Sequence, residues 1–321
     1  MINMKTWVLT ELTQAQKERL PKGYEYVFSK ELNKEEIKDV EVIVGRPPFE
    51  LLPYAKNLKW LQLDSAGSEH YCKAGLLPEG CVLTNATGSF GLTISEYLIC
   101  TILMLMRNMN LYVRNQEQAK WQIEGPIYSI YGSTFLIVGL GNLGIEFAKR
   151  IKALGGYTIG IKKHIEQSVE YIDQLYTMDQ IEDVLPKADV VVMALPSTEE
   201  TRKSFHGEYF DLMKETAIWA NVGRGDVVET MDVVNAVKEK KILGAVLDVC
   251  DTEPIPADHP IWKEENIIIT PHISGTFQLP KTKDIFVDIL CENLEAFKNE
   301  EPLRNIVDVK EGYRSYALKK S

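Results

Sequence analysis

The chain of 321 residues is long enough for two domains, each with its own apolar core. Its 45% apolar and 26% charged residues are typical of a globular protein, and the longest apolar stretch, residues 97–106, is too short to span a bilayer. The net charge of −10 argues against a nucleic-acid partner and against an anionic membrane surface.

The first hundred residues alternate between short apolar runs and helical patterns, which predicts a small α/β domain. The expected strands and helices cover residues 6–10, 24–28, 40–44, 58–63 and 81–84, and residues 14–20 and 34–38, respectively. Ligands of open parallel sheets bind beyond the carboxyl ends of the strands. Arg46 follows the third strand, so it is a candidate to meet an anionic substrate, although a surface arginine before two prolines would give the same pattern.

Residues 96–107 (EYLICTILMLMR) are apolar on almost every side, which predicts a helix that is buried on most of its surface. Such a helix packs between domains, against a second subunit or within one subunit, and the sequence leaves these three possibilities open. Residues 112–131 are more polar and are expected to form a helix and a loop that lead into the next domain.

The most informative motif begins with an apolar run at residues 135–138, which predicts a buried strand. The glycines that follow have G-x-G-x-x-G spacing: Gly139, Gly141 and Gly144. A helical pattern comes next, and residues 157–161 form a second expected strand. This order indicates a site for the pyrophosphate of a dinucleotide, because the helix N-terminus presents unpaired N–H groups there. A turn of a parallel sheet that binds no ligand is the alternative.

The second strand ends at Lys162 and Lys163, where dinucleotide-binding domains usually carry an acid that bonds the adenosine ribose. An acid would repel a 2′-phosphate, whereas two lysines would attract one. The lysines therefore favour NADP over NAD as the cofactor. Two solvated lysines at a strand end would have the same sequence, so NAD stays open.

Strand and helix patterns continue to alternate after this motif. Further strands are expected at residues 189–195, 216–221, 244–249 and 266–270, which gives six strands counted from residue 135. Six strands with helices between them indicate an α/β fold with a Rossmann-type doubly wound parallel sheet. Residues 284–299 predict a long amphipathic helix, and the tail beyond it is expected to return to the first domain.

Three charged or ionisable residues lie at or just beyond strand ends in this half of the chain: Arg224, Glu253 and His272. Reduction of a 2-oxo acid by hydride transfer needs a proton donor for the carbonyl oxygen, which a histidine supplies near neutral pH. It also needs a cation for the carboxylate, and the planar guanidinium of arginine makes two hydrogen bonds to one. A carboxylate bonded to the other imidazole nitrogen fixes the ring. Taken singly, each residue has an ordinary alternative as a turn, loop or core residue.

The segments that carry these three residues resemble signature segments of the D-isomer-specific 2-hydroxyacid dehydrogenases. They are NVGRGDVV (residues 221–228), LDVCDTEPIP (residues 247–256) and ITPHISG (residues 269–275), in the same order and with agreeing spacing. The likeness extends to LKWLQLDSAGSEHY (residues 58–71) and NATGSFGLTISEY (residues 85–97), so it covers nearly the whole chain.

The resemblance implies an oxidoreductase that transfers a hydride between NAD(P)H and C2 of a small 2-oxo acid to give a D-2-hydroxy acid. It implies that His272 is the general acid and base, Glu253 its partner and Arg224 the residue that binds the substrate carboxylate. The implied cofactor contacts are Gly139, Gly141, Asn142, Leu143, Gly144, Lys162, Lys163, Leu195, Pro196, Thr201, Val222, Arg224 and Asp248. The expected substrate contacts are Arg46, Ala66, Gly67 and Arg224.

The resemblance also implies a flavodoxin-like substrate domain of residues 1–101 and 288–321 and a dinucleotide-binding domain of residues 102–287. It further implies a homodimer built around the helix of residues 96–107. Five cysteines without CxxC spacing indicate reduced thiols in a cytoplasmic protein with no metal site. Cys250 and Asp251 stand where the family often has an aromatic residue and a glutamate, so the pocket shape is expected to differ there.

A second hypothesis is a dinucleotide-sensing protein with little turnover, like the transcriptional corepressors that resemble this family. Such a protein would change partners with the state of its cofactor. The intact trio of arginine, glutamate and histidine favours the enzyme, because a sensor has no need of an acid–base pair.

Overall fold

The structure is a computed structural model that describes residues 4–165, 167–310 and 312–314. The chain divides into two compact units, one of Met1–Phe90 and Phe277–Ser321, the other of Gly91–Thr276. The first unit is discontinuous, and the last residues of the predicted substrate domain, 315–321, lie outside the described residues.

Both unit boundaries lie 11 residues earlier than predicted, at residue 90 rather than 101 and at residue 276 rather than 287. The first difference arises because helix α2 (Gly91–Met106) packs along its length within the second unit, against helix α4 (Asn142–Ala153). The second arises because the ring of Phe277 packs against Phe90 and Phe286, which both belong to the first unit.

The first unit contains a five-stranded parallel sheet with the order β2-β1-β3-β4-β5. Its strands are β1 (Met4–Val8), β2 (Tyr24–Phe28), β3 (Val42–Val44), β4 (Trp60–Gln62) and β5 (Val82–Thr84). This is the flavodoxin-like strand order, so the predicted class of the smaller domain is confirmed. The strands lie at or close to their predicted positions, and β2 has the predicted bounds.

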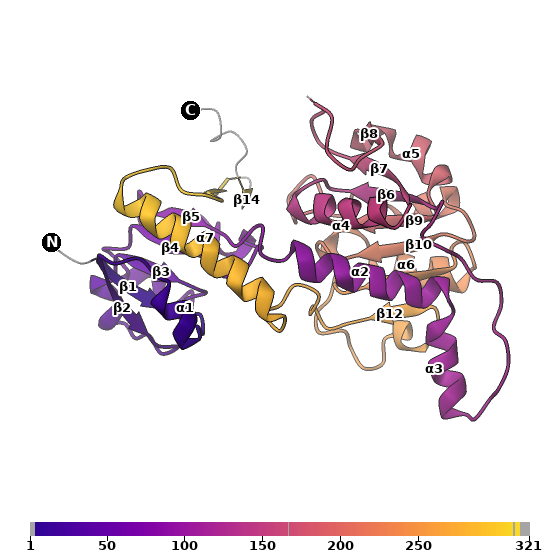
Figure 1. The fold of residues 1–321 in the computed structure, drawn as a ribbon, viewed down its shortest axis with the longest axis horizontal. Helices are drawn as coiled ribbons and strands as arrows, with labels where there is room; N and C mark the ends of the chain where they lie inside the picture. The colour runs from indigo at the N-terminus through magenta and orange to yellow at the C-terminus, as the bar shows by residue number, and fades with distance from the viewer. Residues whose placement is uncertain (1–3, 166, 311, 315–321) are drawn as a thin grey trace. The chain divides into compact units, whose positions relative to one another are not determined.

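The helices of the first unit are α1 (Gln14–Glu18) and α7 (Pro280–Lys298), and α7 crosses one face of the sheet (Figure 1). The ring of Phe297 lies 5.2 Å from that of Trp60 on β4, so the C-terminal helix covers the N-terminal sheet. A two-stranded antiparallel sheet follows, β13 (Val307–Asp308) with β14 (Tyr313–Arg314). The helix predicted at residues 34–38 is instead a single 3₁₀ turn, Glu36–Asp39, too short to close an α-helical hydrogen-bond ladder.

The second unit contains a seven-stranded parallel sheet with the order β12-β11-β10-β9-β6-β7-β8. Its strands are β6 (Thr134–Val138), β7 (Tyr157–Ile161), β8 (Gln174–Tyr176), β9 (Val190–Met193), β10 (Ile218–Asn221), β11 (Gly244–Leu247) and β12 (Ile267–Ile269). The predicted doubly wound sheet is confirmed, but its six predicted strands are one too few. The missed strand, β8, has only three residues with no apolar alternation, and it forms by pairing with the edge of β7.

The other helices of this unit are α3 (Met109–Glu117), α5 (Ile181–Val184) and α6 (Thr230–Lys238). Of the 16 residues of α2, eight are buried, including Leu98, Ile102 and Leu105, and only Glu96 and Cys100 are exposed, so the predicted burial over most of its surface is confirmed. Helix α3 projects from the rest of the unit (Figure 1).

In the described part of the chain no single helix is long and apolar enough to cross a membrane; α2 and α3, which meet at 69°, reach that length and composition only when taken together.

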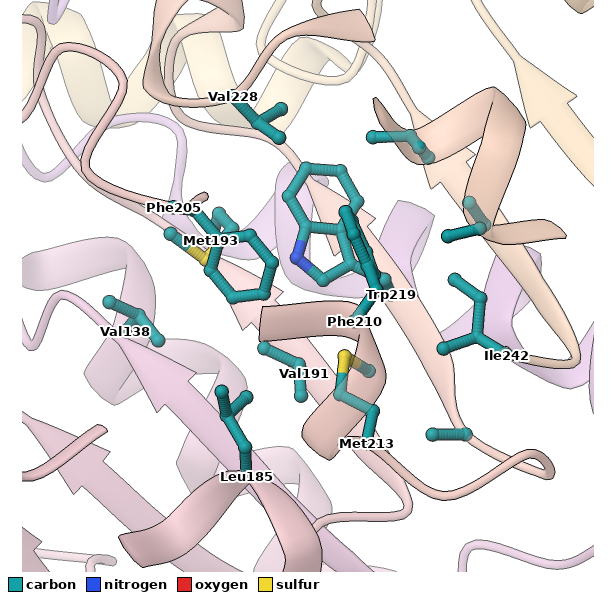
Figure 2. Close-up of a cluster of buried hydrophobic side chains, with 14 of the residues drawn as sticks. Val138, Leu185, Val191, Met193, Phe205, Phe210, Met213, Trp219, Val228 and Ile242 are labelled. Atoms are coloured by element: carbon teal, nitrogen blue, oxygen red, sulfur yellow. The ribbon is translucent and has the colours of Figure 1, made fainter. Parts of the chain in front are cut away.

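A cluster of buried apolar side chains covers one face of the seven-stranded sheet (Figure 2). The opposite face is buried as well, for example at Phe135 and Val192. The indole of Trp219 on β10 is fully buried against the rings of Phe205 and Phe210, with centroid distances of 5.6 and 5.9 Å. Its Nε1–H has no hydrogen-bond partner among the described residues. The ring is therefore held by packing alone, and this packing supports the strands whose carboxyl ends carry the predicted site.

Replacement of Trp219 tests this packing. We expect Trp219→Ala to lower the free energy of unfolding by about 3–5 kcal/mol, since it leaves a large cavity. Trp219→Phe should cost less than about 1.5 kcal/mol, because it keeps a ring and removes the unpaired N–H. Urea unfolding followed by circular dichroism measures both changes. Equal losses in the two variants would contradict a stabilising role for the ring contacts.

Candidate active site

The glycine turn joins β6 to α4 at the carboxyl edge of the seven-stranded sheet. Gly139 has φ of +104°, and a Cβ there would lie 2.6 Å from the carbonyl oxygen of Ala194. A Cβ at Gly144 would lie 2.2 Å from the carbonyl oxygen of Gly139, so only glycine permits this contact between helix and strand. The first and third glycines of the motif are thus required by the backbone itself.

The N-terminus of α4 presents main-chain N–H groups that no side chain caps. Gly141 is the N-cap residue, and in the described structure no side chain accepts a hydrogen bond at this cap. The N–H groups of Asn142, Leu143 and Gly144 lie in the first turn, where the helix offers them no carbonyl acceptor. The turn lies on β6, between β7 and β9, where the strand order reverses. These features fit the pyrophosphate of a dinucleotide.

Lys162 and Lys163 follow β7 directly and are both exposed. Nζ of Lys163 lies 2.6 Å from Oε2 of Glu200, which belongs to the loop after β9. Lys162 makes no side-chain hydrogen bond or ion pair with any residue that the structure describes. The two lysines predicted to recognise a 2′-phosphate therefore differ in their surroundings.

The loop after β9 contains Leu195, Pro196 and Thr201, which are predicted cofactor contacts. The Thr201 hydroxyl donates to the carbonyl oxygen of Pro196 at 2.6 Å and accepts the N–H of Thr198 at 2.8 Å. Thr201 thus closes the turn that holds Leu195 and Pro196 beside β6.

The turn after β10 carries Arg224 between two glycines that pack closely on other loops. A Cβ at Gly223 would lie 2.5 Å from the carbonyl oxygen of Leu195, and one at Gly225 would lie 1.8 Å from that of Cys250. The buried side chain of Asn221 accepts the N–H of Gly223 and donates to the carbonyl oxygen of Arg224. The close packing and these two hydrogen bonds fix the main chain at Arg224, whose side chain is half-buried. Val222, a predicted cofactor contact in the same turn, is buried.

The structure brings the side chains of Glu253 and His272 together. Nδ1 of His272 lies 2.9 Å from Oε2 of Glu253, and Oε1 of Glu253 accepts the N–H of Cys250 at 3.0 Å. One carboxylate oxygen is therefore fixed by the main chain while the other orients the imidazole. Burial raises the pKa of the Cys250 thiol to about 11, so this thiol is neutral beside Glu253 at physiological pH.

Asp248, a predicted cofactor contact, supports the turn that carries His272. Its buried carboxylate accepts hydrogen bonds from the N–H groups of Ile273 and Ser274, at 2.8 and 3.0 Å, and from the hydroxyl of Ser274. The carbonyl oxygen of Asp248 accepts the N–H of His272 at 2.9 Å. His272 has φ of +53°, a left-handed conformation that needs such support.

Sequence reasoning did not single out Thr270 and Tyr97. The hydroxyl of Thr270 donates to Asp248 at 2.5 Å, and the phenol of Tyr97 on α2 lies 2.7 Å from the same hydroxyl. Thr270 lies two residues before His272 in the segment ITPHISG, so its position in this motif could have marked it as a residue of the site. Asp251 was noted only for departing from the family pattern. It accepts hydrogen bonds from the N–H and hydroxyl of Thr230 and so caps α6.

The predicted substrate contacts Arg46, Ala66 and Gly67 lie in the first unit, at the carboxyl ends of the neighbouring strands β3 and β4. Nε of Arg46 donates to Oδ1 of Asp64 at 2.9 Å, and the hydroxyl of Thr10 donates to Oδ2 at 3.0 Å. Asp64 therefore fixes the orientation of the exposed Arg46 guanidinium. The other predicted residues described above all belong to the second unit.

The sequence pattern of the "D-isomer specific 2-hydroxyacid dehydrogenase, NAD binding domain" matches residues 99–274, more than half of the chain. The chain belongs to the D-isomer-specific 2-hydroxyacid dehydrogenase family. The resemblance noted in the sequence is thus confirmed, and the family is one of NAD(P)-dependent oxidoreductases.

Named relatives in this family extend over most of the chain. A glyoxylate reductase of Korarchaeum cryptofilum is 30% identical over 87% of this chain and 86% of its own length. A glyoxylate/hydroxypyruvate reductase A of Photorhabdus laumondii is 29% identical over 84% of this chain and 87% of its own. The crystal structure of a family member from Aeromonas salmonicida, 30% identical, covers 96% of this chain and 100% of its own with a TM-score of 0.83.

Removal of the Asp248 carboxylate tests its support of the His272 turn. We expect Asp248→Ala to lower the free energy of unfolding by about 2–4 kcal/mol, because main-chain N–H groups lose their buried acceptor. The matched control, Asp258→Ala, removes an exposed carboxylate of the same region and should cost less than about 0.5 kcal/mol. Urea unfolding of the three proteins measures the difference. Equal stability of the two variants would rule out this role.

Proposed function

We propose that this member of the family reduces a small 2-oxo acid to the D-2-hydroxy acid, with the acid–base chemistry carried by His272. The observation that supports this most is the 2.9 Å contact between His272 and Glu253 in the unit that also holds the glycine turn. The bound dinucleotide supplies the hydride to C2 of the substrate. The protein supplies the proton, the binding groups and their orientation.

His272 donates the proton to the substrate oxygen during reduction. Glu253 engages Nδ1, which directs the ring and leaves Nε2 for proton exchange with the substrate. In the opposite direction the same nitrogen accepts the proton of the hydroxyl group. The supported turn at residues 270–274 keeps the ring in one orientation through both directions.

Arg224 binds the substrate carboxylate in this proposal. Its guanidinium offers a planar set of N–H donors that match two carboxylate oxygens, and the turn that carries it packs against Cys250, three residues before Glu253. Arg46, Ala66 and Gly67 contribute further substrate contacts from the first unit. We propose glyoxylate or hydroxypyruvate as the substrate, on the strength of the named relatives.

We propose that the cofactor lies on the turn of Gly139, Gly141 and Gly144, with its pyrophosphate at Asn142 and Leu143. Leu195, Pro196, Thr201, Val222 and Asp248 are the further predicted residues of this site. The choice between NADP and NAD depends on Lys162 and Lys163, which favour NADP because a 2′-phosphate carries negative charge.

The dinucleotide-sensing alternative has less support. The relatives named above are reductases, and the paired histidine and glutamate serve proton transfer. We also propose that the protein is cytoplasmic, since its cysteines are free thiols in the structure.

The catalytic assignment is tested by replacing the histidine. We expect His272→Ala to lower kcat for glyoxylate by roughly two to four orders of magnitude, the usual contribution of general acid–base catalysis. NADPH affinity should stay within about threefold, because the cofactor contacts are untouched. His206→Ala, which removes an exposed histidine of the same unit, is the control and should leave kcat within about twofold. A near-wild-type kcat for His272→Ala would refute the assignment.

We propose that two copies form a homodimer around the predicted helix of residues 96–107, which belongs to α2, with the contact made through the adjoining helix α3 and the segment that follows it. Exposed apolar side chains line this region: Met109, Val113, Trp121, Ile123, Ile127 and Tyr131. Asn108 and Asn115 anchor the segment through hydrogen bonds to Glu124 and Pro126, so it keeps a defined shape. A fully exposed tryptophan on an ordered apolar surface favours burial against a second copy.

Trp121→Asp should convert the dimer to a monomer, because a carboxylate would be buried in the contact. Sedimentation at micromolar concentration distinguishes the two states, which differ by one chain of 36.4 kDa. Trp262→Asp, at an exposed tryptophan outside this region, is the control and should stay dimeric. A monomeric wild-type protein, or a dimeric Trp121→Asp variant, would contradict the proposed interface.

A further inference from the structure

The ion pair between Lys163 and Glu200 spans the carboxyl end of β6. Lys163 follows β7 and Glu200 follows β9, and these two strands flank β6 in the sheet. The pair, with 2.6 Å between Nζ and Oε2, therefore joins the two loops on either side of the glycine turn. It lies where the adenosine half of the proposed cofactor reaches the end of β7.

Glu200 is held in place by the turn to which it belongs. Thr198 and Thr201 bond each other through main chain and side chain, and the N–H of Arg202 donates to the carbonyl oxygen of Thr198. Ser197 and Arg202 both contact Asp226, which ties the turn to the segment after β10. The carboxylate of Glu200 is thus presented to Lys163 by an anchored turn.

The ion pair with Glu200 offsets the positive charge of Lys163 at the place where the 2′-phosphate of NADP would bind. A 2′-phosphate, which carries close to two negative charges, needs the ammonium group that Glu200 already occupies. It must displace the carboxylate and then lies within a few ångströms of that negative charge. A ribose with a free 2′-hydroxyl leaves the pair intact. The two lysines therefore attract a 2′-phosphate less strongly than two unpaired ammonium groups would.

We propose that Glu200 is a cofactor-specificity residue, whose carboxylate lowers the affinity for NADPH and thereby lets the enzyme use NADH as well. Lys162, which has no partner among the described side chains, then supplies the remaining positive charge for the phosphate. This inference rests on the proposed dinucleotide-binding function and refines its cofactor choice.

The test compares Glu200→Gln with Glu199→Gln, its neighbour in the same turn, which is exposed and forms no ion pair in the described structure. Equilibrium titration with NADPH and NADH gives each Kd without any need for turnover. We expect Glu200→Gln to lower the Kd for NADPH by about three- to tenfold and to leave that for NADH within about twofold. Glu199→Gln should change both by less than about twofold, and the Glu200 effect should fade at 1 M salt.

The outcomes separate this inference from the proposed function. Equal NADPH affinities in the two variants, or equal gains for NADPH and NADH in Glu200→Gln, would overturn the specificity role and leave dinucleotide binding standing. An effect unchanged at 1 M salt would also overturn it, since it would not be electrostatic. Failure of the wild-type protein to bind either dinucleotide would overturn the proposed function and this inference together.

Discussion

The arrangement of the candidate active site depends on the buried carboxylate of Asp248. Two strands end side by side here, since Leu247 of β11 pairs with Ile269 of β12. Asp248 directly follows β11, and its carboxylate accepts hydrogen bonds from Thr270, Ile273 and Ser274 in the segment that follows β12. A buried carboxylate is costly unless it is fully hydrogen-bonded, and a left-handed histidine is costly unless it is held. Here the turn that carries His272 supplies the hydrogen bonds that the buried Asp248 carboxylate needs, and Asp248 holds the backbone of His272 in its left-handed conformation.

The glycines of the site have two roles that a sequence cannot separate. Gly139, Gly144 and Gly225 are required by close contacts within the polypeptide, so the structure would need them even without a ligand. The same close packing leaves the N-terminus of α4 uncapped and brings the Arg224 turn against Cys250. The glycine spacing therefore indicates the backbone geometry directly, and indicates the dinucleotide only through that geometry.

Much of the architecture could be predicted from the sequence, because β2 and the β6–α4 unit carry strong local patterns. The strand β8 could not, since its three residues become a strand only through the free edge of β7. The contact between His272 and Glu253 was expected from family resemblance, and the two side chains do meet. Their support by Asp248 and Thr270 was not, because it depends on the register of β11 with β12.

The charge around the two lysines at the end of β7 could not be predicted from the sequence either, because it also depends on which loops the sheet brings together. Their sequence places two positive charges side by side, which alone favours a phosphorylated cofactor. The fold brings Glu200 to one of them from 37 positions further along the chain, through the strand order β9-β6-β7. A surface ion pair of this kind contributes little to stability, but it changes the local charge that an incoming anion meets. The proposed role of Glu200 would make cofactor choice depend on the loop after β9 as well as on the two lysines.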